Sequence, residues 1–139
     1  MQFGLFLNFN GNCREALDLY SEVFNSEVKN LMTFGEAPAD PTMPIKDSEK
    51  DRIMYAEINI GGLDVMFMDN SDDWPITVGN NIQPTITVES EDEVRRLIDA
   101  LRVDGKVFME PTKTFFADLY GMVEDRFGVI WQIMYYVES

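Results

Sequence analysis

The chain repeats one order of local patterns twice, and this repeat constrains its fold more than any other feature. Each copy begins with an alternating apolar run, continues with a capped amphipathic segment, and ends in two apolar runs joined by a glycine-containing turn. The expected helix caps, Asn12 and Ser90, lie 78 positions apart, whereas the final turn glycines, Gly61 and Gly128, lie 67 positions apart. The difference of 11 positions is close to the length of a proline-rich segment that the second copy lacks. The sequence therefore predicts an internal duplication with one insertion.

The first half of the chain opens with a strand and a helix. Phe3 to Phe9 carries apolar residues with a period of two, which predicts a strand. Asn12 and Glu15 form an asparagine variant of the capping box, which predicts a helix start. We expect this helix to bury one face, made of Cys13, Ala16, Leu17, Tyr20, Val23 and Phe24.

Three further strands and one long loop complete the first half. Strands are expected at residues 28–34, 53–60 and 63–69, and Gly61-Gly62 suits the positive φ angles of a hairpin turn. The prolines of residues 35–50 prevent regular structure there. We interpret this Pro-rich segment as a loop or a flap.

The second half repeats the order after a polar, turn-rich linker at residues 70–81. A strand is expected at residues 82–89, and Ser90 with Glu93 forms a second capping box before a helix that Gly105 is placed to end. Its apolar stripe is Val94, Leu97, Ile98 and Leu101, and strands are expected at residues 107–109, 119–123 and 129–136. The sequence thus predicts an α+β fold with two tandem βαβββ modules, residues 1–70 and 80–139, in a single domain of residues 1–139.

The charge balance excludes two classes of partner. The chain has 25 acidic residues against 11 Lys and Arg, which gives a formal net charge of -14. Phosphate backbones and anionic membranes repel such a surface, so we expect neither nucleic acid nor a membrane as partner. The acidity serves either solubility or the attraction of cationic ligands. One cysteine, no basic leader and no long apolar run favour the cytoplasm.

The absence of histidine removes most catalytic classes. The chain contains no His, which excludes a Ser-His-Asp triad, a Cys-His pair and imidazole metal ligands. A single cysteine excludes thiolate clusters, and Cys13 on the apolar helix face is interpreted as a buried hydrophobe. Gly61-Gly62 lacks the strand, loop and helix context of a phosphate-binding loop.

Carboxylates, amides, phenols and one lysine remain as candidates. Tyr55 and Glu57 are two apart in a predicted strand and share a face, where Glu57 acts as a general base or is simply solvated. Lys113 precedes Phe115, Phe116 and Tyr120, so it either holds an anionic ligand or covers core aromatics.

The last strand and the methionines give further candidates. Trp131 and Gln132 point to opposite faces, which places Trp131 in the core and Gln132 toward a cavity. Met66, Met68 and Met109 either fill gaps in the core or line an adaptable pocket.

Three segments resemble the PhnB-like branch of the glyoxalase/bleomycin-resistance superfamily, also called vicinal oxygen chelate proteins. These are LNFNGNCREALDLYSEVF (residues 7–24), GNN (79–81) and KTFFADLYGMVEDRFGVIWQI (113–133), and the resemblance runs essentially end to end. It implies paired βαβββ modules whose sheets curl around a cavity, usually in a homodimer. Members of this branch often carry the name of a ubiquinone-pathway methyltransferase, yet this chain shows no Gly-rich loop for a nucleotide-like methyl donor.

The resemblance also implies where superfamily metal ligands would stand. In metal-dependent members they are mainly His and Glu from the first strand and a late strand of each module, which correspond here to Leu5, Val65, Gln83 and Gln132. Leu5 and Gln83 share the offset of 78, and Val65 and Gln132 share that of 67. Two aliphatic chains and two neutral amides do not suit a divalent ion, so no metal and no cofactor is expected.

These observations lead to three hypotheses of function. The first is a metal-independent protein that binds or sequesters an unidentified small molecule. Its pocket is drawn from Tyr55, Glu57, Gln83, Thr85, Lys113, Tyr120 and Gln132. The second is an isomerase or lyase with Glu57 as general base, and the third is a dimeric interaction module without turnover.

Overall fold

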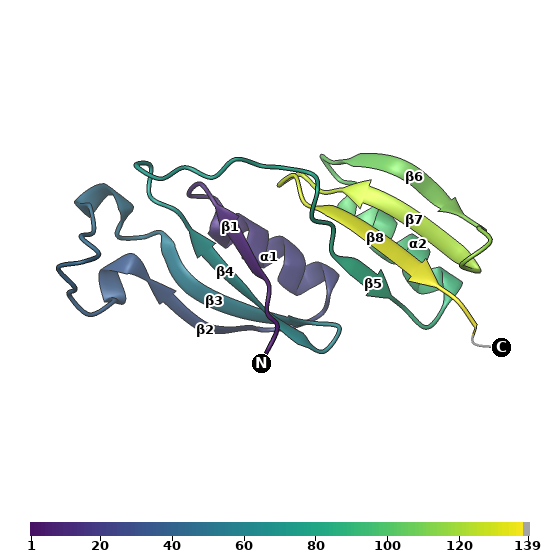
Figure 1. The fold of residues 1–139 in the computed structure, drawn as a ribbon, viewed down its shortest axis with the longest axis horizontal. Helices are drawn as coiled ribbons and strands as arrows, with labels where there is room; N and C mark the ends of the chain where they lie inside the picture. The colour runs from purple at the N-terminus through teal and green to yellow at the C-terminus, as the bar shows by residue number, and fades with distance from the viewer. Residues whose placement is uncertain (138–139) are drawn as a thin grey trace. The chain divides into compact units, whose positions relative to one another are not determined.

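The chain folds into two modules with the same order of elements. The structure, a computed structural model, describes residues 1–137, and the chain divides into two compact units between Thr77 and Val78. This boundary falls inside the predicted linker, while a single domain formed by both modules stays a prediction. The first module contains β1 (Phe6–Phe9), α1 (Cys13–Val23), β2 (Val28–Thr33), β3 (Ile53–Ile60) and β4 (Leu63–Asp69). The second contains β5 (Thr85–Thr87), α2 (Glu91–Leu101), β6 (Lys106–Thr112), β7 (Leu119–Glu124) and β8 (Ile130–Tyr135) (Figure 1).

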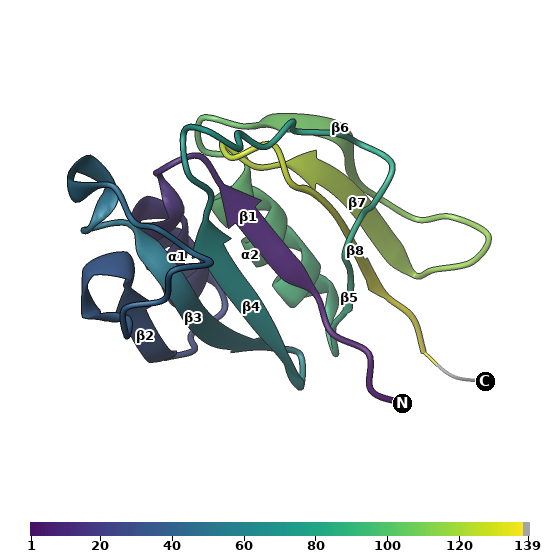
Figure 2. The ribbon, with the colours of Figure 1, turned by 60° about the vertical axis from the view of Figure 1, so that its left-hand side comes forward.

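Each module is a four-stranded mixed sheet, which confirms the α+β prediction. The strand order is β1-β4-β3-β2 in the first module and β5-β8-β7-β6 in the second. In each sheet the first strand runs parallel to the last one, and the other neighbours are antiparallel (Figure 2). The repeat is thus a repeat of topology as well as of sequence pattern.

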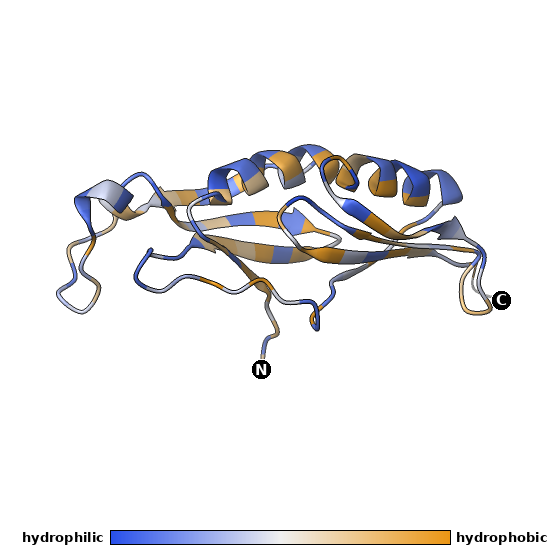
Figure 3. Ribbon diagram, turned by 90° about the horizontal axis from the view of Figure 1, so that it is seen from above, coloured by the Kyte–Doolittle hydropathy of each residue, from blue (hydrophilic) through white to orange (hydrophobic). Residues whose placement is uncertain are grey.

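One helix covers one face of each sheet, as Figure 3 shows. The apolar faces follow the predicted spacing: α1 buries Cys13, Ala16, Leu17, Tyr20 and Val23, and α2 buries Val94, Leu97, Ile98 and Leu101. Phe24, which was also expected on the α1 face, follows the end of the helix and is half-buried. Tyr20 packs on Phe67 of β4, with ring centroids 5.8 Å apart. Burial of each large side chain contributes roughly 1.5–3 kcal/mol, so these faces hold each helix on its sheet. We call the opposite side of each sheet its open face.

The two helix starts differ in how they are capped. Ser90 accepts a hydrogen bond from the Glu93 N–H, as predicted. The prediction for Asn12 is wrong, because its side chain makes no capping hydrogen bond. Instead Asp69, at the end of β4, accepts from the N–H groups of Gly11 and Cys13 at 2.9 and 3.0 Å. A residue distant in sequence therefore accepts the N–H hydrogen bonds at the start of α1 that a local cap would accept.

Three strands differ in length from their predictions by more than two residues. β1 begins at Phe6, not Phe3, and β5 spans three residues of the expected 82–89. Both are edge strands that pair on one side, and Pro84 before β5 has no N–H to donate. Conversely, β6 extends beyond Met109 to Thr112, because an edge strand tolerates Pro111.

The turns also show one correction. Gly61 and Gly62 have φ of 60° and 96°, as the hairpin prediction requires. Gly105 does not end α2, since the helix stops at Leu101 and the left-handed residue is Asp104, with φ of 57°. Gly105 is instead a point of close approach, because a Cβ there would lie 2.2 Å from the Glu124 carbonyl oxygen.

The core contains both residues that were assigned to it. Trp131 is 2% exposed, and its indole N–H donates to Asp125 at 2.9 Å. Cys13 is fully buried, and this burial raises the pKa of its thiol far above the usual range. Within residues 1–137 every helix is too short or too polar to traverse a lipid bilayer.

Candidate functional site

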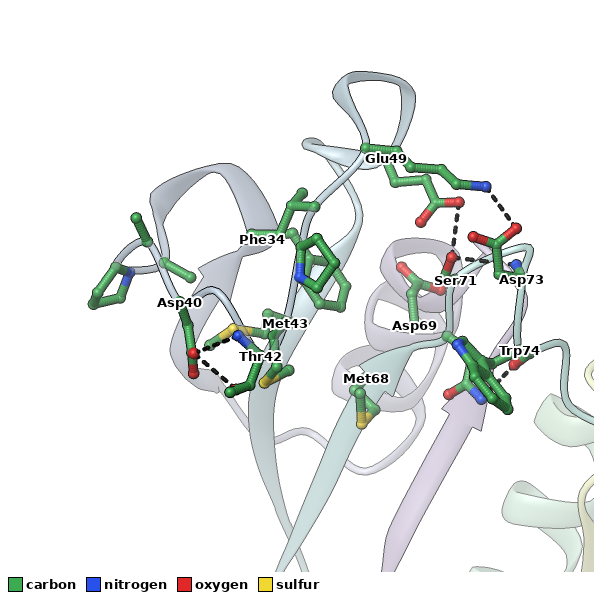
Figure 4. Close-up of a pocket in the computed structure, with 18 residues that line it drawn as sticks. Phe34, Asp40, Thr42, Met43, Glu49, Met68, Asp69, Ser71, Asp73 and Trp74 are labelled. Carbon is green, nitrogen blue, oxygen red and sulfur yellow. Dashed lines mark hydrogen bonds and ion pairs between the residues drawn. The ribbon is translucent and has the colours of Figure 1, made fainter.

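A cavity of about 680 Å³ lies in the first module, under the Pro-rich segment. Its walls come from the β2–β3 connection, from Met54 of β3, and from β4 with the turn that follows it (Figure 4). The lining residues are Phe34, Ala37, Pro38, Ala39, Asp40, Thr42, Met43, Pro44, Ile45, Lys46, Glu49, Met54, Met68, Asp69, Asn70, Ser71, Asp73 and Trp74. The second module joins β6 to β7 with residues 113–118 alone, so it lacks the segment that roofs this cavity.

The Pro-rich segment is fixed at its base and irregular in between. The N–H groups of Phe34 and Gly35 donate to the carbonyls of Arg52 and Lys50, which closes the loop at its two ends. Thr33 caps a short 3₁₀ turn at Phe34–Glu36, and Asp40 accepts from the N–H and hydroxyl of Thr42. These local bonds shape the roof without a strand or α-helix, as the prolines require.

The apolar part of the lining combines aromatic rings and thioethers. Phe34 and Met43 come from the loop, Met54 and Met68 from the sheet, and Trp74 from the turn after β4. Figure 4 shows Phe34, Met43 and Met68 between Asp40 at one end and Glu49 with Ser71 at the other. Because methionine side chains repack easily, this lining suits ligands of varied outline.

Charged groups surround one end of the cavity. Lys46 forms an ion pair with Asp73, with Nζ and Oδ1 2.7 Å apart, and this hydrogen bond raises the pKa of the ammonium. Glu49 is only 6% exposed, and its Oε1 accepts from the Ser71 hydroxyl and the Asp72 N–H, both at 3.1 Å. Carboxylates thus outnumber cations at this end.

None of the seven predicted site residues lines this cavity. The signals that point to it are weak ones: a proline-rich insertion, a tryptophan within a polar linker, and Met68, which was one of the candidate pocket methionines. Local patterns do not show that these segments meet, because they are separated along the chain and brought together by the sheet.

Tyr55 and Glu57 lie together on the open face of the first sheet, as their spacing predicts. The Tyr55 hydroxyl donates to Glu57 Oε2 at 3.0 Å, and the Asn30 amide donates to Oε1. Asn30 adopts a φ of 56° at a bulge in β2, which aims its amide at Glu57. Burial and the bond to Glu57 raise the pKa of Tyr55. Both oxygens of Glu57 are engaged, and its role as a base stays a prediction.

Three other candidates form a chain of hydrogen bonds on the open face of the second sheet. The Tyr120 hydroxyl donates to Gln132 Oε1 at 2.8 Å, and the Gln132 amide donates to Gln83 Oε1 at 2.7 Å. Thr85 pairs with Gln132 in the ladder between β5 and β8. Burial raises the pKa of Tyr120. Lys113 lies exposed, and Phe116 is the ring that packs on Tyr120, at 5.1 Å.

The strand pairs that correspond to the superfamily metal positions carry unsuitable ligands. β1 pairs with β4 so that Phe6 is opposite Met66, and Phe6 contacts Tyr55 on the open face. Val65 is instead 3% exposed, and its side chain lies on the α1 side of the sheet with that of Phe67. On the open face its place is taken by the next residue, Met66, which is opposite Phe6. An aromatic ring, a thioether, Thr85 and Gln132 do not offset the dehydration of a divalent ion. In the described part of the chain, no group of three His, Cys, Asp or Glu is arranged to hold a metal.

The fold is that of the glyoxalase/bleomycin-resistance superfamily. A glyoxalase/bleomycin resistance protein/dioxygenase family enzyme from Burkholderia phytofirmans matches with a TM-score of 0.61 at 13% identity, over 95% of this chain and 97% of its own. At this identity the likeness concerns the fold alone.

Closer relatives define the family. The family model described as 3-demethylubiquinone-9 3-methyltransferase matches residues 2–134, and the chain belongs to this PhnB-like family. Protein YjdN of Escherichia coli is 30% identical over 141 residues, covering 96% of this chain and 94% of YjdN. The crystal structure of PA1353 from Pseudomonas aeruginosa matches with a TM-score of 0.87 at 33% identity over 99% of both chains. The structure of a PhnB protein from Bacillus cereus matches with a TM-score of 0.75 at 24% identity, over 97% of this chain and 99% of its own. The predicted resemblance is therefore confirmed.

Proposed function

We propose that this protein binds or sequesters a small organic molecule in the cavity of its first module, without a resident metal. The observation that carries this proposal is the cavity itself. Its volume of about 680 Å³ falls in the range of roughly 300–1,000 Å³ that is typical of small-molecule sites. Its apolar rings and thioethers, with a few polar groups at its two ends, are the usual composition of such a site.

Metal independence rests on the chemistry of the side chains at the superfamily positions. The predicted positions carry Leu5, Val65, Gln83 and Gln132, and the strand pairs beside them carry Phe6, Met66 and Thr85. A protein with either set should not retain a stoichiometric divalent ion there. We expect purified protein incubated with Zn²⁺, Mn²⁺ or Ni²⁺ and then dialysed to contain well below one metal per chain by elemental analysis. One tightly held ion per chain would contradict this part of the proposal.

Methyl transfer, which the family description names, forms no part of this proposal. A glycine-rich loop between a strand and a helix is a common device for holding nucleotide-like ligands, and the β1–α1 and β5–α2 connections lack such a loop. A homodimer and a cytoplasmic location stay predictions.

Binding in the cavity is expected to perturb its methionines selectively. In protein labelled with ¹³C at the methionine methyl groups, fragments of a chemically mixed library that bind should shift the signals of Met43, Met54 and Met68. The signals of Met122 and Met134 in the second module serve as internal references. Met68→Trp fills part of the cavity, so it should weaken binding about tenfold or more.

Met122→Trp provides the matched control, since it places the same side chain on β7, outside the lining. This variant should retain the affinity of the wild-type protein. A library in which no binder shifts the cavity methyls, or binders that Met68→Trp leaves untouched, would contradict the proposed site.

A further inference from the structure

We infer that the cavity selects an organic cation, a molecule with one ammonium-type charge on an apolar or aromatic body, and that Glu49 recognises the charge. This inference rests on the proposed function and gives the chemical class of its ligand. It follows from the hydrogen bonds of Glu49, from the charge balance of the lining, and from the position of the aromatic rings.

Glu49 is a buried carboxylate with one oxygen available. Its side chain is held in place because Oε1 accepts from Ser71 and from the Asp72 N–H. Among the described residues, no donor bonds to Oε2. That oxygen keeps access to the cavity, since no fully buried side-chain oxygen of the described residues lacks a hydrogen-bond partner. A carboxylate with only 6% exposure still gains from a cation and further donors that face it. A ligand ammonium would supply both.

The other charged groups of the lining are already engaged. Asp69 is 1% exposed, and it accepts from Gly11 and Cys13 at Oδ1 and from the Ile53 N–H at Oδ2. Lys46 is paired with Asp73. Asp40, at the opposite end of the cavity, is exposed and accepts from the N–H and the hydroxyl of Thr42. No cation of the lining remains to receive an anionic ligand, so Glu49, the buried carboxylate with an available oxygen, sets the sign of the charge that fits.

The cations next to the lining are also paired. Arg52 donates to Asp72 at 2.8 Å and to the Asn70 carbonyl at 2.7 Å, and Lys50 contacts Asp47 at 2.9 Å. These contacts leave the field at this end of the cavity negative, in line with the net charge of -14.

The apolar lining fits the remainder of such a ligand. Phe34 and Trp74 present aromatic faces, which attract cations as well as apolar groups. Trp74 is 77% exposed, so its ring has apolar surface left to cover. Met43, Met54 and Met68 complete a surface suited to an alkyl or aryl body.

Three probes with a similar phenyl-alkyl body and end groups of different charge test the effect of charge on binding. They are 4-phenylbutylamine, 4-phenylbutan-1-ol and 4-phenylbutyrate. In titrations of the methionine-labelled protein, the amine should shift the methyl signals of Met43, Met54 and Met68. Its affinity should be about tenfold higher than that of the alcohol. The butyrate should bind more weakly than the alcohol. This comparison uses the wild-type protein and does not depend on a variant that folds.

Glu49→Gln then tests the residue, since an amide oxygen still accepts from Ser71 and Asp72 without a charge. It should lower the affinity for the amine about tenfold and leave that for the alcohol unchanged. Glu22→Gln on the exposed side of α1 removes the same charge away from the lining and should change neither affinity. Equal binding of amine and alcohol at the cavity methyls, or an amine affinity that Glu49→Gln leaves unchanged, would overturn the cation inference while the proposed function stands. An amine that does not shift these methyls would overturn it as well, whereas the mixed library decides the proposed function separately.

Discussion

Asp69→Ala is expected to lower the free energy of unfolding of the first module by about 4 kcal/mol. The carboxylate joins three parts of the module, because it accepts from Gly11 and Cys13 at the start of α1 and from Ile53 at the start of β3. At 1% exposure, water does not replace it. The N–H groups of Cys13 and Ile53 are buried, and each costs about 1–3 kcal/mol when it is left without an acceptor, so these two account for a loss of this size. The Gly11 N–H is only partly buried and can turn to water. Urea denaturation followed by circular dichroism measures it.

Two variants show whether hydrogen bonding is the cause. Asp69→Asn retains one acceptor oxygen but turns an amide N–H toward one of the donors, so its stability should lie between those of the wild-type protein and Asp69→Ala. Asp18→Ala removes a carboxylate from the exposed side of α1, and its urea midpoint should equal that of the wild-type protein. An Asp69→Ala variant within about 1 kcal/mol of the wild-type protein would show that the three N–H groups find other acceptors.

Gly105→Ala is expected to destabilise the second module by about 3 kcal/mol or more. Its Cβ would lie 2.2 Å from the Glu124 carbonyl oxygen, 3.0 Å from that of Leu101 and 3.2 Å from the Asp125 Cα. All three atoms belong to the backbone, so relief requires the end of β7 or the turn after α2 to move. Forcing extra atoms into such a contact typically costs 1–3 kcal/mol, and backbone displacement adds to that.

Trp131 reports on this change, since it is buried on β8 beside β7. We expect its fluorescence to shift to longer wavelength at a lower urea concentration in Gly105→Ala. Gly79→Ala is the matched control, because the nearest atom to its Cβ would be Asn81 Oδ1 at 3.6 Å, and its transition should be unchanged. A wild-type transition in Gly105→Ala would mean that the approach to Glu124 is not close in solution.

Much of the fold is predictable from the sequence because its strongest patterns are local. β3 and β4 have the predicted bounds, since a double glycine separates two apolar runs. Both helices follow from their apolar stripes and begin where expected. The errors arise where distant residues intervene. Asp69 caps the helix in place of Asn12, and the close approach of the Glu124 carbonyl leaves no room for a side chain at Gly105.

The candidate site was less predictable for the same physical reason. Tyr55 with Glu57, and Gln83 with Gln132, come together because strand spacing and the repeat relate them directly. The cavity depends on an irregular segment folding over the ends of two strands, and no periodicity encodes that. The carboxylate proposed to recognise the ligand, Glu49, stands in a run of charged residues, a pattern that indicates an exposed position.

The insertion between β2 and β3 has a consequence for stoichiometry. Two copies of one module would ordinarily offer two equivalent sites, yet residues 34–52 join the strands in the first module where residues 113–118 do so in the second. The proposed receptor therefore saturates at one ligand per chain, whatever its state of assembly.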